Sequence, residues 1–317
     1  MIYLLSAIIF GSLFSVVLKL CQRWQIDSQQ VILFNYASAF VITLVPILFR
    51  MAGPGGGPLQ DFTLRPASVG ACVLQGVLFL TGFSIMDLCT WRCGVALTTT
   101  AARASLVLPV LLSWIFLSQP APSWLAVGLI LAAMVLIVLP AGERNTAGSL
   151  QSSSAEARPA GAKTSGRRRA AMALVAVFLA FGLSDFTLKL AQHSVEPVSA
   201  GDATLLDRQL DALTCVIFLM ASLAGLVVCL VTGSFRKHQV DWRSLLAGLA
   251  LGLVNIVCTS CSLKALSVLS TGTFYPLYNM GIVILATLIG VLFFKEKLRP
   301  LQIAGLALSI VAIALAF

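Results

Sequence analysis

Residues 142–169 read GERNTAGSLQSSSAEARPAGAKTSGRRR, and this polar stretch divides a chain that is otherwise almost continuously apolar. It is rich in Gly, Ser and Ala and ends in three arginines. Such a composition does not bury a core, and it predicts a flexible basic linker. Five apolar stretches precede the linker and five follow it, each close to the length that a helix needs to cross a bilayer.

These ten stretches run approximately over 2–20, 30–50, 68–90, 94–117, 123–141, 170–192, 204–232, 245–265, 270–294 and 301–317. The 317 residues are 59% hydrophobic and 10% charged, whereas soluble domains carry about 25% charged residues. A soluble protein is therefore excluded. We predict an all-α membrane protein, because a helix satisfies its own backbone hydrogen bonds inside lipid.

Short internal matches indicate that the chain is duplicated. Residues 18–22 (LKLCQ) match 188–192 (LKLAQ), and further matches follow in chain order at slowly increasing separations. We predict a first five-helix repeat over 1–141 and a second over 170–317. Because five is odd, the second repeat must enter the membrane from the opposite side. Ten transmembrane helices in two inverted five-helix repeats are typical of secondary transporters.

The net charge of +9 is attributed to membrane topology and contact with anionic lipid, and no nucleic-acid partner is expected. Most of the 21 Lys and Arg residues fall in the odd-numbered connections, including 142–169. The positive-inside rule places that loop in the cytoplasm and both termini outside. We expect a multi-pass protein of the plasma membrane, which in a bacterium is the inner membrane.

The ends of the two halves share a short pattern. Residues 293–298 read FFKEKL and precede Ile-Ala-Gly at 303–305, while residues 116–120 read FLSQP and precede Ala-Val-Gly at 126–128. With this pattern and its five-plus-five organisation, the chain resembles the drug/metabolite transporter superfamily, specifically its EamA-like ten-helix members. Glu296 fits the family pattern and Gln119 departs from it. The resemblance implies a secondary active transporter with both termini cytoplasmic, the reverse of the orientation that the charges favour.

Charged residues inside spans are costly and are functional candidates by default. Arg103 lies near the middle of its predicted span, where its guanidinium is a candidate ligand for a substrate carboxylate or phosphate. The alternatives are an ion pair with Asp87 on the preceding helix and extension of the Arg103 side chain to the nearer membrane surface. Asp87 and Asp185 are candidate proton-coupling carboxylates. For Asp185 an ion pair with Lys189, four residues later on the same helix, is the simpler interpretation.

Polar and aromatic side chains within spans are further substrate-binding candidates. Tyr275, Tyr278 and Asn279 cluster around a proline, and packing of these amphipathic groups between helices is the alternative interpretation. Interhelical hydrogen bonding explains Asn35, Gln75 and Asn255 equally well. Lys19 and Lys189 are expected to extend toward the membrane surface from helix ends, and His193 and His238 to be solvated in loops.

The sequence contains no metal-binding, nucleotide-binding or nucleophile motif, so we expect no cofactor, no metal and no enzymatic activity. We predict an EamA-like permease that moves a small polar metabolite, such as an amino acid or related organic anion, by alternating access. A proton is the candidate coupling ion. The alternatives are a non-transporting membrane scaffold and an intramembrane enzyme acting on lipid. The oligomeric state stays open.

Overall fold

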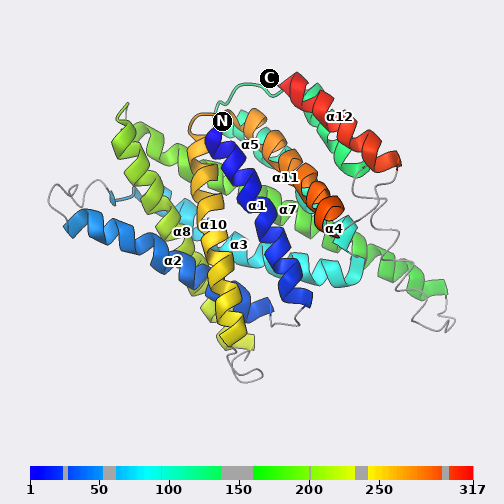
Figure 1. Cartoon of the computed structure of the whole chain (residues 1–317), viewed down its shortest axis with the longest axis horizontal. Coiled ribbons are helices and arrows are strands. Elements are labelled where there is room, and N and C mark those ends of the chain that lie inside the picture. The colour runs from blue at the N-terminus through cyan, green and yellow to red at the C-terminus, as the bar shows by residue number, and fades with distance from the viewer. Residues whose placement is uncertain are drawn as a thin grey trace. The chain divides into compact units, whose positions relative to one another are not determined.

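The structure is a computed structural model that describes residues 1–23, 28–52, 62–93, 95–136, 160–199, 201–232, 242–294 and 300–316. Regular structure in these residues is helical (Figure 1). The labelled helices are α1 (Ile2–Arg23), α2 (Ser28–Ala52), α3 (Pro66–Cys93), α4 (Val95–Ala104), α5 (Val107–Phe116), α7 (Ala160–Ser199), α8 (Ala203–Thr232), α10 (Trp242–Leu266), α11 (Thr271–Phe294) and α12 (Pro300–Ala316). A shorter apolar helix covers Trp124–Leu136.

Seven helical segments of the described residues are long and apolar enough to cross a bilayer. They are Gln30–Ala52, Pro66–Met86, Thr98–Phe116, Ala170–Pro197, Ala203–Val231, Trp242–Leu266 and Thr271–Ile289. The prediction of an all-helical protein with multiple spans is therefore confirmed. The count of ten spans and their inverted repeat stay predictions.

The fourth apolar stretch, predicted as one helix, is broken between α4 and α5. Ser105 and Leu106 form a turn, in which the Leu106 amide bonds to the Arg103 carbonyl (3.3 Å) and the Leu108 amide to the Ser105 carbonyl (2.9 Å). Pro109 explains the break. A proline has no amide hydrogen, and its ring clashes with the carbonyl of the residue four positions earlier, which here is Ser105.

Helix α7 differs from the prediction at both ends. It begins at Ala160, within the stretch expected to be a linker, and it continues to Ser199, beyond the predicted end of the span. The alanines, lysine and arginines after residue 159 are good helix formers, which accounts for the early start. Residues 142–159 lie outside the described residues.

The chain folds into two compact units, and each unit combines segments from both halves of the sequence. The first unit contains Met1–Leu80 and Thr187–Phe274, and the second unit contains Thr81–Phe186 and Tyr275–Phe317. Helices α3, α7 and α11 each contribute residues to both units.

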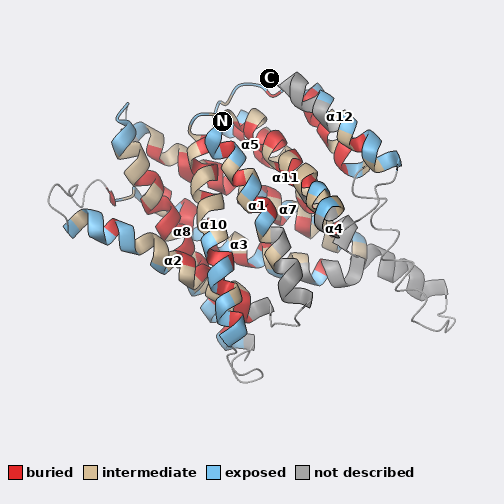
Figure 2. Ribbon diagram, in the orientation of Figure 1, coloured by how far each residue is buried: buried red, intermediate tan, exposed pale blue. Residues whose placement is uncertain are grey.

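In the first unit, α2 packs against α10 and α8, and α1 packs against α10 (Figure 1). The α2–α10 contact depends on two glycines one turn apart. A Cβ at Gly248 would meet the Cβ of Phe34, and a Cβ at Gly252 would meet the hydroxyl of Ser38. The backbones approach this closely because glycine has no side chain, a common device of membrane helices. Exposed apolar residues cover the other faces of α2 and α8, as a lipid-facing surface requires (Figure 2).

In the second unit, α7 packs against α3 and α5. The rings of Phe83 and Phe181 meet edge to face with 6.1 Å between their centroids. A Cβ at Gly182 would lie 2.5 Å from the Leu108 side chain, so α5 sits directly on the α7 backbone there. Cys89, Ala102 and Val177 form a buried cluster in this unit. The packing fixes the end of α4, where Arg103 is located.

Candidate functional site

Arg103 lies in the last turn of α4, directly before the break, and its side chain is partly buried. Its Nη1 donates to Oδ1 of Asn279 on α11 at 3.1 Å. A cation is favoured at this position because the carbonyl end of a helix carries partial negative charge. The break therefore stabilises the guanidinium at the carbonyl end of α4.

Asn279 and Tyr275 connect α11 to its neighbours in the second unit. Asn279 is 2% exposed, and its Nδ2 donates to the Tyr275 carbonyl at 3.1 Å. The buried Tyr275 hydroxyl donates to the main-chain carbonyl of Asp185 on α7. Bonds from α4 to α11 and from α11 to α7 thus place three predicted candidates in one cluster. Tyr278, half-buried, lies on the same helix.

The Asp185 side chain belongs to the same unit and interacts electrostatically with Arg103. The intrahelical ion pair expected between Asp185 and Lys189 is wrong, since the Lys189 ammonium donates to other groups. Arg103 and Asp185 thus place a guanidinium and a carboxyl group in one cluster. The side chain of Asp87 lies outside the described residues, so its predicted pair with Arg103 stays a prediction.

The remaining substrate-binding candidates lie in the first unit. Asn255 on α10 donates its Nδ2 to Oδ1 of Asn35 on α2 at 3.4 Å, and the Thr259 hydroxyl donates to Oδ1 of Asn255 at 3.4 Å. Asn35 and Gln75 are buried. The Asn35–Asn255 bond joins the two helices that meet at Gly252, as expected for an interhelical hydrogen bond.

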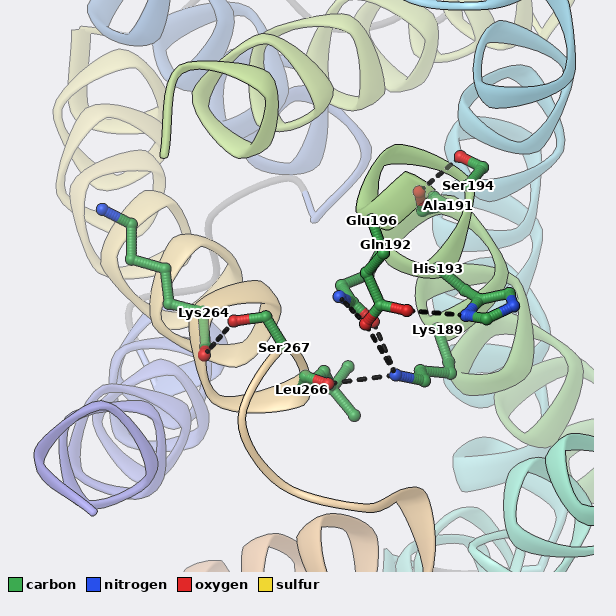
Figure 3. Close-up of polar contacts among 9 residues, drawn as sticks. All are labelled: Lys189, Ala191, Gln192, His193, Ser194, Glu196, Lys264, Leu266 and Ser267. Atoms are coloured by element: carbon green, nitrogen blue, oxygen red, sulfur yellow. Dashed lines mark hydrogen bonds and ion pairs between the residues drawn. The ribbon is translucent and has the colours of Figure 1, made fainter. Parts of the chain in front are cut away.

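A second polar cluster, in the first unit, surrounds Lys189 on α7 (Figure 3). Lys189 is 2% exposed, and its Nζ donates to Oε1 of Gln192 at 2.6 Å and to the Leu266 carbonyl at 3.0 Å. Oε1 of Glu196 lies 3.7 Å from the same nitrogen. The expectation that Lys189 extends toward the membrane surface is wrong, because α7 continues for ten residues beyond it.

The other residues of this cluster are held by Glu196. Its Oε1 accepts from Nε2 of Gln192 at 2.7 Å, and its Oε2 lies 2.8 Å from Nδ1 of His193. His193 is therefore in a helix and paired, which corrects the expectation of a solvated loop. His238 and Glu296 lie outside the described residues, as does the Lys19 side chain. The sequence does contain a signal for this network. Gln192 and His193 precede Glu196 by four and three residues, the spacings at which side chains meet on one face of a helix.

No metal centre is evident in the part of the chain that the structure describes. No group of three or more His, Cys, Asp or Glu residues there is placed to hold a metal ion. The Arg103 cluster and the Lys189 cluster each contain a charged side chain that is partly or fully buried.

Comparison with known proteins relates the second half of the chain to a known family. The model of the EamA-like transporter family matches residues 168–317. An uncharacterized protein of Haemophilus influenzae is 25% identical over 316 residues, which cover 98% of this chain and 95% of that relative. The resemblance stated from the sequence is thereby confirmed. Residues 168–317 thus match the EamA-like transporter family, and the chain is a multi-pass membrane protein.

Proposed function

We propose that this protein is a secondary active transporter that moves a small polar metabolite, an amino acid or related organic anion, by alternating access. The match of residues 168–317 to the EamA-like transporter family favours transport over a scaffold or a lipid-modifying enzyme. The matched segment nearly coincides with the predicted second repeat, which supports the inverted-repeat architecture of such transporters. The protein would lie in the plasma membrane with the 142–169 loop in the cytoplasm, where the positive charges favour it.

The observation that carries this proposal is the hydrogen bond between Arg103 and Asn279. One guanidinium N–H is held by Oδ1 of Asn279 at 3.1 Å, so the plane of the group is oriented. Within the described residues its other donors make no side-chain hydrogen bond. A planar guanidinium presented in this way matches a carboxylate bidentately. We infer that Arg103 binds the substrate carboxylate and that Asn279 orients Arg103.

Asp185 adds a negative charge to the same cluster. Asp185 forms no ion pair with Lys189 among the described residues, and Arg103 attracts its carboxylate, so this carboxylate is suited to accept a substrate ammonium. A substrate with a carboxylate and an ammonium group would satisfy both charges at once. A carboxylate at this position is also the natural acceptor for a coupling proton.

The test is uptake into liposomes that contain the purified protein, measured with a panel of zwitterionic amino acids and small organic acids. We expect Arg103→Ala to weaken binding of the transported substrate about 10- to 100-fold, the cost of losing hydrogen bonds to a charged group. Asn279→Ala should weaken binding less, because the guanidinium remains but is no longer oriented.

Arg50→Ala is the matched control. Arg50 pairs with Asp211 at 2.7 Å at an exposed position of the first unit, and its loss should leave uptake unchanged. The thermal unfolding midpoint of each variant without substrate separates loss of binding from loss of folding. Undiminished uptake of every substrate by a folded Arg103→Ala variant would refute the role of Arg103. Absence of uptake by the native protein for every compound would refute the proposed substrate class.

A further inference from the structure

The ammonium of Lys189 is buried at the carbonyl end of another helix. Leu266 is the last residue of α10, and its carbonyl oxygen lies 3.0 Å from Nζ. The last carbonyls of a helix have no partner within that helix. Figure 3 shows the lysine reaching across to this carbonyl, while Lys264, two residues earlier, points elsewhere. Lys189 thus supplies the end of α10 with a positive charge from a different helix.

The other carbonyls near this end already have partners. The Leu263 carbonyl accepts from the Ser267 amide at 3.1 Å, and the Ala265 carbonyl from the Leu269 amide at 2.8 Å. The Lys264 carbonyl accepts the Ser267 hydroxyl at 2.8 Å. The turn between α10 and α11 is therefore closed by its own groups, except at Leu266, where the lysine closes it.

The oxygens around Nζ form the kind of ligand set that binds a hard cation. They comprise a main-chain carbonyl of Leu266, a side-chain amide oxygen of Gln192 and a carboxylate oxygen of Glu196. Hard cations are bound by carbonyl, amide and carboxylate oxygens. Gln192 is fully buried, and its amide is oriented because its Nε2 donates to Glu196. The Gln192 amide oxygen therefore points toward Nζ of Lys189.

We propose that the end of α10 is a monovalent-cation site formed by Leu266, Gln192 and Glu196, and that the ammonium of Lys189 fills it as a tethered cation. A buried ammonium without such ligands would be strongly destabilising. The other charged groups nearby fit this assignment. His193 interacts with the second oxygen of Glu196, and Lys264 is paired with Asp207 of α8 at 2.5 Å. Ser68 of α3 contributes only a neutral hydrogen bond to Ser194.

The site lies at the start of the turn that leads from α10 into α11. Across the same turn, the hydroxyl oxygen of Thr271 is buried and has no hydrogen-bond partner among the described residues. The Thr271 hydroxyl is therefore a hydrogen-bonding group that the present arrangement of the turn leaves unused. Release of the lysine would leave the Leu266 carbonyl unpaired as well, so the arrangement of the turn depends on whether the site holds a cation.

The cation site does not depend on transport, and its test uses stability alone. The full-length protein is purified in detergent as native, Lys189→Ala and Lys264→Ala forms. Thermal unfolding midpoints are measured while NaCl, KCl or methylammonium chloride replaces choline chloride at constant ionic strength. Removal of the lysine side chain should empty the site. We expect Lys189→Ala to unfold at a lower midpoint in choline, and a small cation to raise that midpoint saturably.

The native protein should not respond to the exchange of cations, because the lysine occupies the site. Lys264→Ala should not respond either. The lost ammonium pairs with Asp207 at an accessible position, and Lys189 still occupies the site. The assignment is refuted if Lys189→Ala is no less stable than the native protein in choline. It is equally refuted if none of the three small cations stabilises Lys189→Ala more than it stabilises Lys264→Ala.

If Lys189→Ala does not fold in any of these salts, Gln192→Ala tests the same site with the lysine retained. Loss of one oxygen ligand should weaken the hold of the ammonium on Leu266. Amides of residues 267–269 should then exchange with deuterium several-fold faster than in the native protein, while amides of α8 should not change. Unchanged exchange at residues 267–269 would refute the site.

Discussion

Substitution of Gly252 by alanine tests how closely α2 and α10 must approach. A Cβ at this position would contact the hydroxyl of Ser38 and would lie 2.9 Å from the Asn35 carbonyl oxygen and 3.3 Å from the Ala39 amide nitrogen. A hydroxyl can rotate, but two of these atoms belong to the α2 backbone. The helices must therefore move apart by several tenths of an ångström along the contact.

The cost follows from two opposing effects. Overpacking of a tight contact costs about 1–3 kcal/mol, and the separation would also weaken the Asn35–Asn255 hydrogen bond, which is worth about 1 kcal/mol. Alanine in a helix recovers roughly 0.5–1 kcal/mol relative to glycine. The net expectation for Gly252→Ala is a loss of about 1–3 kcal/mol.

Gly70 provides a matched control within the same unit. It also lies in a helix, α3, but a Cβ there would have nothing within 4 Å. Gly70→Ala should therefore cause no overpacking. The higher helix propensity of alanine should stabilise the protein by up to about 1 kcal/mol. The assay compares thermal unfolding midpoints of the native protein and both variants in one detergent. If Gly252→Ala unfolds at the same midpoint as Gly70→Ala or above it, the proposed close backbone contact is wrong.

Two further predictions concern helix ends. Pro109→Ala should remove the clash with the Ser105 carbonyl and let α4 and α5 join, so we expect slower amide exchange at residues 106–110; unchanged exchange would show that packing, rather than the proline, maintains the break. At the start of α8, hydrogen bonds from the Thr204 hydroxyl and from the amides of Leu205 and Thr204 lower the pKa of Asp202 below its ordinary value of 3.8. This stabilisation is complete above the ordinary pKa and is lost as the pH falls through the lowered value, so exchange at Thr204 and Leu205, corrected for intrinsic rates, should accelerate below about pH 4 in the native protein. Asp202→Asn, which still accepts these bonds, should show no such acid dependence; an identical dependence would exclude Asp202 as its source.

The helical membrane architecture is readable from hydropathy because lipid leaves a backbone few alternatives. Arg103 was also predictable as a candidate, since a guanidinium inside a span must find partners. Its partner Asn279 was a candidate because it clusters with Tyr275 and Tyr278 in the sequence, but the bond between Arg103 and Asn279 depends on how α4 and α11 pack. The break beside Arg103 has a local cause that the sequence does contain. Pro109 lies four residues beyond Ser105, and a continuous helix is disfavoured at that spacing.

Lys189 shows why the rest was harder to predict. Hydropathy reports where a helix leaves the apolar layer, and it falls after Gln192 because polar residues follow. The helix nevertheless continues, because Glu196 bonds back to Gln192 and His193 within the same turn. The lysine is therefore interior to α7, and its burial is stabilised by the Leu266 carbonyl, 77 positions away in the chain. A lysine near the apparent end of a span is thus free to extend to water only if the helix truly ends there. Where capping pairs prolong the helix, the same lysine must find oxygen ligands inside the protein, and the end of α10 provides them.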